Sequence, residues 1–216
     1  MSVTGHKRGN AQEKLADRSA ASGKKIDRRA QRTRAALHGA LMSLILERDY
    51  DGISIGDIAD TANVGRSTFY AHFTDKDDLL RDGLGHLREV LLEQQDGATV
   101  GHDHPALRGL GFSRFMTAHL KERHQLYRAL MRGRAGPIVV DKIREFLSEI
   151  VRAELASRES AVASPVAPEI AVRFVVGAYM SVVTWWLDRG GREPPEEIDR
   201  AFRDLALHGL GKLLQR

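Results

Sequence analysis

Residues 53–73 read ISIGDIADTANVGRSTFYAHF, and this stretch decides the fold. Ser54 followed three residues later by Asp57 is a capping-box pattern, in which the Ser54 hydroxyl caps free amides and the Asp57 carboxylate reaches back to Ser54. The pattern therefore predicts a helix over residues 55–61.

A tight turn and a second short helix follow. Asn63 tolerates the left-handed backbone that a tight turn needs, and the helix after it is predicted over residues 65–71. Two short helices joined by such a turn form a helix-turn-helix. Its small core is predicted to consist of Ile58, Ala59, Ala62, Val64 and Phe69.

A longer helix precedes the motif and another follows it. Helical periodicity begins near Arg28, and residues 49–52 end that helix. Its apolar stripe is Ala36, Leu37, Ala40, Leu41, Leu44 and Ile45. The next long helix is predicted to open at residues 74–78, with Asp75 as its cap and acidic residues in its first turn.

The pattern remains helical to the end of the chain, and no stretch alternates as a strand would. Further helices are predicted over residues 75–97, 105–122, 123–132, 137–158, 167–189 and 194–214. We therefore expect an all-α fold. Its expected parts are a disordered basic arm (1–26), a helix-turn-helix domain (27–82) and a helical regulatory and dimerisation domain (83–216).

Charge is distributed unevenly along the chain. Residues 1–34 hold ten Lys or Arg against three acids, although the net charge of all 216 residues is only +4. A basic arm suits a phosphate backbone, but it equally suits a solvated tail, and charge alone leaves both readings open. Cysteine is absent, and no signal peptide or uninterrupted membrane-length apolar run is visible, so we expect a cytoplasmic protein with no membrane partner.

The second short helix carries side chains suited to double-stranded DNA. It can enter a major groove with its first residues facing base edges. Arg66 offers a fork of donors suited to guanine, and Ser67 and Thr68 can bond to phosphate or base. The full set of predicted DNA contacts is Arg66, Ser67, Thr68, Tyr70, His72, Lys76 and Ser54.

In these motifs residues 30–82 resemble the tetracycline-repressor (TetR) family, with ISIGDIA at 53–59, ANVGRSTFYAHF at 62–73 and KDDL at 76–79. The resemblance implies three DNA-binding helices followed by a larger helical domain that dimerises and usually holds a small-molecule pocket. It also implies that DNA is commonly touched at the positions of Arg66, Thr68, Tyr70, His72 and Lys76. Gly56, Asp60, Asn63 and Gly65 depart from the usual pattern, which affects the expected affinity more than the function.

The last two predicted helices are the candidate dimer interface. Residues 171–187 carry no charge apart from Arg173, so most of that helix should be covered. In the family that this chain resembles, the last two helices of each subunit form a four-helix interface, which predicts a homodimer. The alternative is that the helix is central in a monomer core. Neighbouring Trp185 and Trp186 diverge by about 100° on a helix, so one can face the interior and the other the interface.

A small-molecule effector would need a pocket in the regulatory domain. The candidate lining residues are Phe115, Met116, His119, Tyr127, Tyr179 and Trp185, drawn from a pool that also holds Phe112, Met131 and Trp186. Each of these residues can equally be plain core.

No catalytic motif, metal site or cofactor site stands out, and His102-Asp103-His104 is interpreted as a solvated loop. The sequence therefore predicts a transcription regulator, a repressor bound to a palindromic operator as a homodimer and released by a ligand. One alternative is a regulator whose C-terminal domain binds a partner protein. A more distant one is an enzyme or scaffold with an incidental helix-turn-helix.

Overall fold

The computed structural model describes residues 28–97, 110–156 and 166–209, and every regular element in these ranges is a helix. The predicted all-α fold is confirmed. The elements in chain order are the first helix (residues 28–47), the 3-10 helix η1 (Tyr50–Gly52), α2 (Ile55–Thr61), α3 (Arg66–Tyr70), α4 (Lys76–Gly97), α5 (Gly111–Glu122), α6 (His124–Leu130), α7 (Ala135–Ala156), α8 (Pro168–Asp188) and α9 (Pro195–His208).

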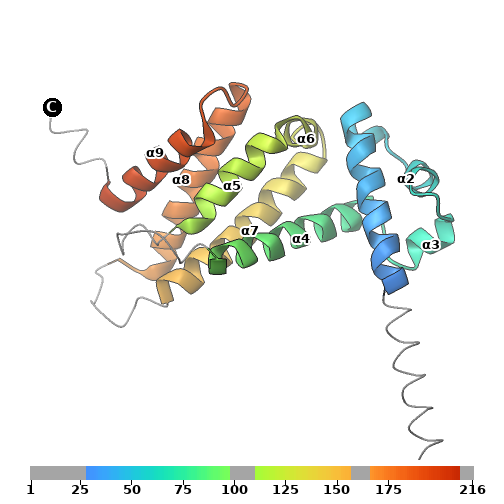
Figure 1. Cartoon of the computed structure of the whole chain (residues 1–216), viewed down its shortest axis with the longest axis horizontal. Helices are drawn as coiled ribbons and strands as arrows, with labels where there is room; N and C mark the ends of the chain where they lie inside the picture. The colour runs from blue at the N-terminus through green and yellow to red at the C-terminus, as the bar shows by residue number, and fades with distance from the viewer. Residues whose placement is uncertain (1–27, 98–109, 157–165, 210–216) are drawn as a thin grey trace, which may run out of the picture.

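The helices form two groups that share one long helix. The first helix, α2 and α3 lie at one end of the molecule, and α5 to α9 form the larger body at the other (Figure 1). Helix α4 starts in the first group and runs into the second, where it packs on α7 and α5. The expected boundary between residues 82 and 83 falls inside this helix, and the predicted arm over residues 1–26 lies outside the described residues.

Three predicted helix bounds were wrong, each for a local reason. Helix α7 begins at Ala135 rather than at Pro137, because a proline in a first turn lacks only an amide that needs no helical partner. Leu110 has a φ of 69°, a left-handed backbone, so no helix runs from residue 105 through it. Helix α9 stops at His208 because Gly209, with a φ of 67°, turns the chain.

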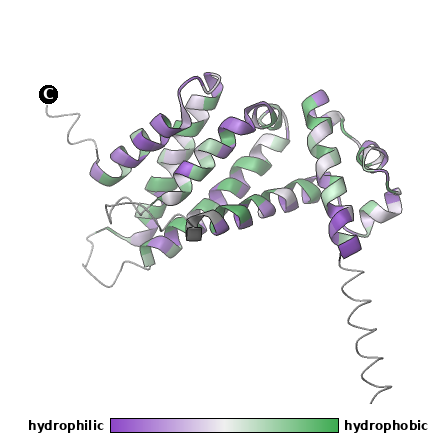
Figure 2. Cartoon of the chain, in the orientation of Figure 1, coloured by the Kyte–Doolittle hydropathy of each residue, from purple (hydrophilic) through white to green (hydrophobic). Residues whose placement is uncertain are grey.

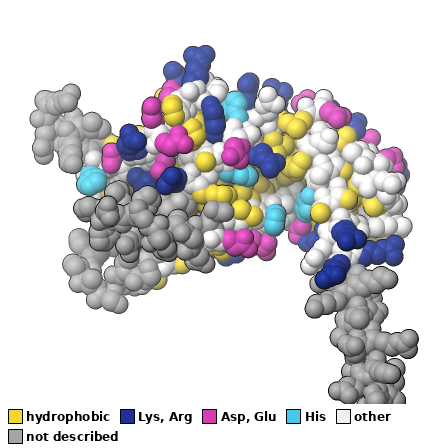
Figure 3. Space-filling model, in the orientation of Figure 1, with side chains coloured by type: hydrophobic (Ala, Val, Ile, Leu, Met, Phe, Trp, Pro, Cys, Tyr) yellow, Lys and Arg dark blue, Asp and Glu magenta, His cyan; other side chains and the backbone are white. Residues whose placement is uncertain are grey.

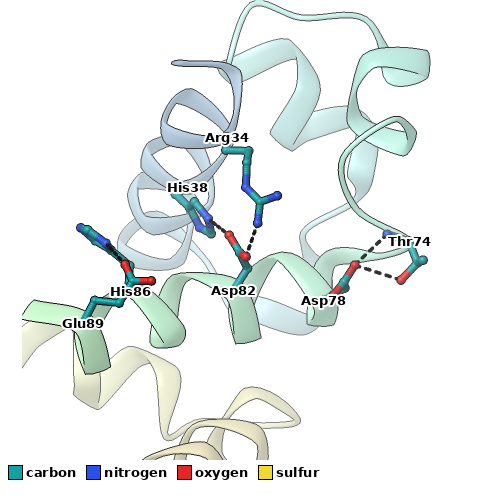
Figure 4. A network of polar contacts seen from close by, with 7 residues as sticks. All are labelled: Arg34, His38, Thr74, Asp78, Asp82, His86 and Glu89. Carbon is teal, nitrogen blue, oxygen red and sulfur yellow. Dashed lines mark hydrogen bonds and ion pairs between the residues drawn. The ribbon is translucent and has the colours of Figure 1, made fainter. Parts of the chain in front are cut away.

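A polar cluster fastens the first helix to α4 (Figure 4). The Asp82 carboxylate accepts a hydrogen bond from Arg34 and lies 2.7 Å from Nε2 of His38. Both partners also contact the Phe73 ring, the Arg34 guanidinium at 5.1 Å and the His38 ring at 5.6 Å. A Cβ at Gly83 would lie 3.0 Å from Nδ1 of His38, so the glycine eases this close approach. The cluster therefore fixes α4 relative to the helix-turn-helix core.

Helix α8 is the central apolar helix of the body. By length and composition it could cross a membrane. It instead packs along α7 and α9, and Figure 2 shows apolar residues along α7 and α8. The buried face of α8 consists of Val172, Val176, Tyr179, Val183 and Trp186. One face of α8 thus forms part of the core of this body.

A buried polar contact ties α9 to the start of α5. The Ser113 hydroxyl has one proton but two acceptors, the Leu110 carbonyl at 2.8 Å and the Asp199 carboxylate. Burial raises the pKa of Asp199, against the opposing effects of the Ser113 hydrogen bond and of Arg203. The Asp199 carboxylate also lies 3.9 Å from the Arg203 guanidinium on the same helix. The Ser113 hydrogen bond to this carboxylate therefore joins α9 to the start of α5.

Candidate DNA-binding site and regulatory cavity

The helix-turn-helix forms as its local sequence predicts. Ser54 and Asp57 make the capping box, with the Ser54 amide donating to the Asp57 carboxylate at 2.8 Å and the Asp57 amide donating to the Ser54 hydroxyl at 3.1 Å. Asn63 has a φ of 53°, the predicted left-handed turn residue. The amide of Val64 then donates to the Ala59 carbonyl at 2.9 Å, which closes the turn against α2.

Phe69 anchors α3 and thereby sets which side chains face outward. Its ring is fully buried and packs against Phe73, with 6.0 Å between ring centroids. Arg66 and Ser67 are exposed, and the Tyr70 side chain is 59% exposed. The other two predicted contacts on and after α3, Thr68 and His72, are half-buried. The predicted readers therefore share one outward surface of α3 and its C-terminal end.

Ser54 and Lys76, the two remaining predicted DNA contacts, have intramolecular roles. The Ser54 hydroxyl also donates to the Asp57 carboxylate at 2.7 Å. The Lys76 ammonium donates to the main-chain carbonyls of Tyr50 at 2.8 Å, Asp51 at 3.2 Å and Ile53 at 2.8 Å. Their contacts with DNA stay predictions. Each residue already makes hydrogen bonds that stabilise the motif.

Exposed cations lie near this surface. Arg28, Arg29 and Arg32 are exposed at the start of the first helix, whereas Arg34 and Arg48 are paired with carboxylates. Figure 3 shows Lys and Arg side chains gathered at this end of the molecule. Exposed surface cations of this kind suit a phosphate backbone.

The larger body, formed by α5 to α9, holds a small apolar cavity between α5, α6, α7 and α8. Its volume is about 50 Å³. The lining residues are Met116, Leu120, Tyr127, Met131, Val140, Ile143, Tyr179, Met180, Val183, Thr184, Leu187 and Asp188. Three of the six predicted pocket residues, Met116, Tyr127 and Tyr179, are among them.

The other three predicted pocket residues lie beside or away from the cavity. Phe115 stacks on His119, which meets the Tyr127 ring edge to face, each pair at 6.0 Å between centroids. Burial, followed by the charge of Arg123, lowers the pKa of His119. The Trp185 side chain is 51% exposed on the outer face of α8. Its neighbour Trp186 is fully buried, and its ring nitrogen donates to the Glu193 carbonyl at 3.2 Å.

Sequence reasoning missed two features of these sites. The α7 side of the cavity was not foreseen, although Val140 and Ile143 lie on the apolar stripe of that helix. Gly56 was noted only as a departure from a pattern, yet it lies buried under the Arg66 side chain. Neither contact is local in sequence, so helical periodicity alone could not reveal it.

Metal chemistry finds no support in the part of the chain that the structure describes. Within residues 28–97, 110–156 and 166–209, no three His, Asp or Glu side chains are grouped to hold an ion. The predicted solvated loop at His102-Asp103-His104 lies outside the described residues.

A helix-turn-helix with an exposed second helix, joined by one long helix to a helical body, defines a DNA-binding transcriptional regulator. Comparison with known families agrees. Residues 37–82 match the model described as bacterial regulatory proteins of the TetR family, and residues 111–208 match a transcriptional regulator C-terminal region. The two matches together cover about two thirds of the chain, which therefore belongs to the TetR family, a family of regulators and not of enzymes.

Individual relatives extend the comparison. The uncharacterized HTH-type transcriptional regulator YxbF of Bacillus subtilis (strain 168) is 48% identical over 59 residues, which span 27% of this chain and 16% of the relative. A TetR transcriptional regulator from Streptococcus agalactiae 2603V is 24% identical with a TM-score of 0.62, over 86% of this chain and 99% of that one. The regulator FadR from Bacillus subtilis, in complex with stearoyl-CoA, is 18% identical with a TM-score of 0.60, over 81% and 98%. Both solved structures show the shared fold.

Replacing Lys76 by Met tests the structural role of its ammonium. Met keeps the apolar stem but loses three charge-assisted hydrogen bonds to main-chain carbonyls, so the free energy of unfolding should fall by about 2 kcal/mol. Urea denaturation of K76M against the wild type measures this. Arg81→Met, at an exposed position of the same helix, is the control and should change stability little. An unfolding midpoint unchanged in K76M would mean that these carbonyl contacts add nothing.

Proposed function

We propose that this TetR-family protein is a repressor that binds an inverted-repeat operator as a homodimer and is released by an apolar small molecule. Each protomer inserts α3 into a major groove, with α2 lying across the backbone. The observation that carries the proposal is the exposure of Arg66, Ser67 and Tyr70 on a recognition helix whose Phe69 is fully buried. Arg66 reads a base, and Tyr70 and His72 contact backbone oxygens.

The outer face of α8 supports the homodimer. Ile170, Phe174 and Trp185 are 61%, 60% and 51% exposed, and they recur along one side of the helix. Gly177 lies on the same side, and a Cβ added there meets nothing within 4 Å, which leaves room for a second helix to approach. An exposed row of large apolar side chains is unusual for a monomer and typical of an interface. A second copy of α8 and α9 related by two-fold symmetry covers it, and the symmetry matches that of an inverted repeat.

The character of the cavity supports an apolar effector. Tyr127 is nearly buried at the cavity wall, and its hydroxyl makes no hydrogen bond to any residue that the structure describes. An apolar molecule with one polar group would satisfy it. FadR of Bacillus subtilis, which shares the fold, was solved in complex with stearoyl-CoA, whose acyl chain is apolar. The cavity must first open, and flexible Met131 and Met180 in its wall are suited to moving aside.

The size of the cavity favours a second candidate function. A volume of about 50 Å³ is far below the roughly 300–1,000 Å³ of typical ligand pockets. A cavity this small between α5, α6, α7 and α8 suits a regulator that responds to a partner protein. In that case no small molecule enters between α5 and α8, and the signal arrives at the surface of the body.

The operator is tested by selection from random duplex DNA. The wild-type protein should enrich an inverted repeat, because two recognition helices related by two-fold symmetry read two half-sites. Affinity should fall steeply as salt rises, because each neutralised phosphate releases counterions. Enrichment of no symmetric sequence, or an affinity that does not change as salt rises from about 50 to about 200 mM, would contradict operator binding.

The dimer interface is tested with Phe174→Glu. Two-fold symmetry brings the new carboxylates of both protomers into an apolar interface. The dissociation constant of the dimer should therefore rise roughly 30-fold or more, as expected for loss of a central aromatic contact. Sedimentation equilibrium measures the dissociation constant. Leu46→Glu is the matched control, because Leu46 is 56% exposed on the first helix, away from this face. A Phe174→Glu variant that dimerises like the wild type would place the interface elsewhere.

The effector is tested by thermal shift with fatty acyl-CoA esters and other apolar metabolites, followed by operator binding. A compound that fills the cavity should raise the unfolding temperature and lower operator affinity, and DNA should weaken its binding by the same factor. Tyr127→Phe should weaken its binding roughly fivefold, because one hydrogen bond contributes about 1 kcal/mol. Tyr70→Phe should affect operator binding alone. Stabilisation without any loss of operator affinity argues against the switch, and no binding at all favours the partner-protein function.

A further inference from the structure

We propose that Gly56 of α2 is a specificity-determining position, because the absence of its side chain lets the Arg66 guanidinium lie against α2 and so fixes the base that Arg66 reads. The inference rests on the proposed function, in which Arg66 contacts operator bases. Gly56 itself touches no base in this account and acts through the placement of Arg66.

The contact between the two residues is close and involves the whole guanidinium. A Cβ built on Gly56 would lie 2.5 Å from one terminal nitrogen of Arg66, 3.1 Å from Cζ and 3.2 Å from Nε. Gly56 is buried, whereas Arg66 is exposed on its outer side. Any residue other than glycine at position 56 must therefore move the guanidinium from its seat on α2.

Nothing else in the described residues holds Arg66 there. Asp57, the neighbour of Gly56 on α2, is occupied by its two hydrogen bonds with Ser54 and by Arg48 at 3.3 Å. The Ser54 hydrogen bonds lower the pKa of Asp57, which keeps it charged and committed to these partners. No carboxylate among the described residues pairs with Arg66, so its donors stay available for a ligand while its position is set by shape.

A fixed guanidinium matters because bidentate recognition is demanding. Two N–H groups must point together at O6 and N7 of one guanine, and a long side chain otherwise loses much rotamer freedom in reaching them. Packing against Gly56 restricts that freedom before DNA arrives, which favours one geometry of approach. Helices α2 and α3 then recognise the base together. Helix α3 carries the Arg66 guanidinium, and α2 provides the surface that orients it.

The substitution Gly56→Ala tests this inference and should leave the fold intact. The atoms that a new Cβ would meet are the far end of a flexible side chain, so Gly56→Ala should displace Arg66 and leave the backbone in place. Alanine is also favoured over glycine within helices. The unfolding temperature of G56A should therefore equal or exceed that of the wild type, and any change in DNA binding is separable from folding.

The experiment selects operators from random duplex DNA with the full chain as wild type, G56A, R66A and the double variant. Gly85→Ala on α4 is the matched control, because a Cβ there meets nothing within 4 Å. We expect G56A to change base preference at the position that R66A changes, and to lose about tenfold in affinity for the wild-type operator. The double variant should behave like R66A alone, and G85A like the wild type.

The remaining outcomes separate the two ideas. If the wild type enriches no inverted repeat, the proposed function fails and this inference falls with it. If R66A changes the selected sequence while G56A keeps the wild-type sequence and affinity, operator reading stands and the role of Gly56 is overturned. If R66A leaves the selected sequence unchanged, Arg66 is no reader and the role of Gly56 is likewise overturned.

Discussion

The ammonium of Lys76, bound to three main-chain carbonyls of the η1 segment, sets where α4 begins relative to the helix-turn-helix. The same segment contributes Tyr50, whose ring lies 4.6 Å below that ammonium and whose hydroxyl donates to Asp77 at 2.6 Å. Desolvation and the hydrogen bond to Asp77 raise the pKa of Tyr50, so the phenol keeps its proton and remains a donor. This joint makes the start of α4 part of the DNA-binding domain.

Residues around Lys76 also contact the larger body formed by α5 to α9. Arg134, at the start of α7, lies 3.5 Å from the Asp77 carboxylate. Its neighbour Gly133, with a φ of 68°, comes so close to Asp51 that a Cβ there would lie 2.6 Å from the carboxylate. Met131, two residues earlier, lines the cavity. Met131 in the cavity wall is therefore only a few residues from Gly133 and Arg134, which contact the residues that position α4. A movement of the cavity wall can reach α4, and through α4 the helix-turn-helix.

Local signals predicted the helix-turn-helix, and long-range packing determined what they could not. The capping box of Ser54 and Asp57 and the left-handed Asn63 follow from neighbouring residues, so the sequence specified them. Which of Trp185 and Trp186 is buried depends on how α8 lies on its neighbours, and periodicity left that open. The contact of Arg66 with Gly56, the hydrogen bonds of Lys76 and the small size of the cavity likewise arise from packing between different elements.

The central claim is that two recognition helices, held by these joints, face successive major grooves. The chain has no cysteine, so Ala71→Cys, at the exposed end of α3, gives one spin label per protomer. Pulsed electron paramagnetic resonance on the selected operator then measures the distance between the two helices. The account predicts a single distance near 34 Å, allowing for the label tethers, because half-sites repeat at about one turn of DNA. A complex with no dipolar coupling, or with a broad spread of distances, would contradict it.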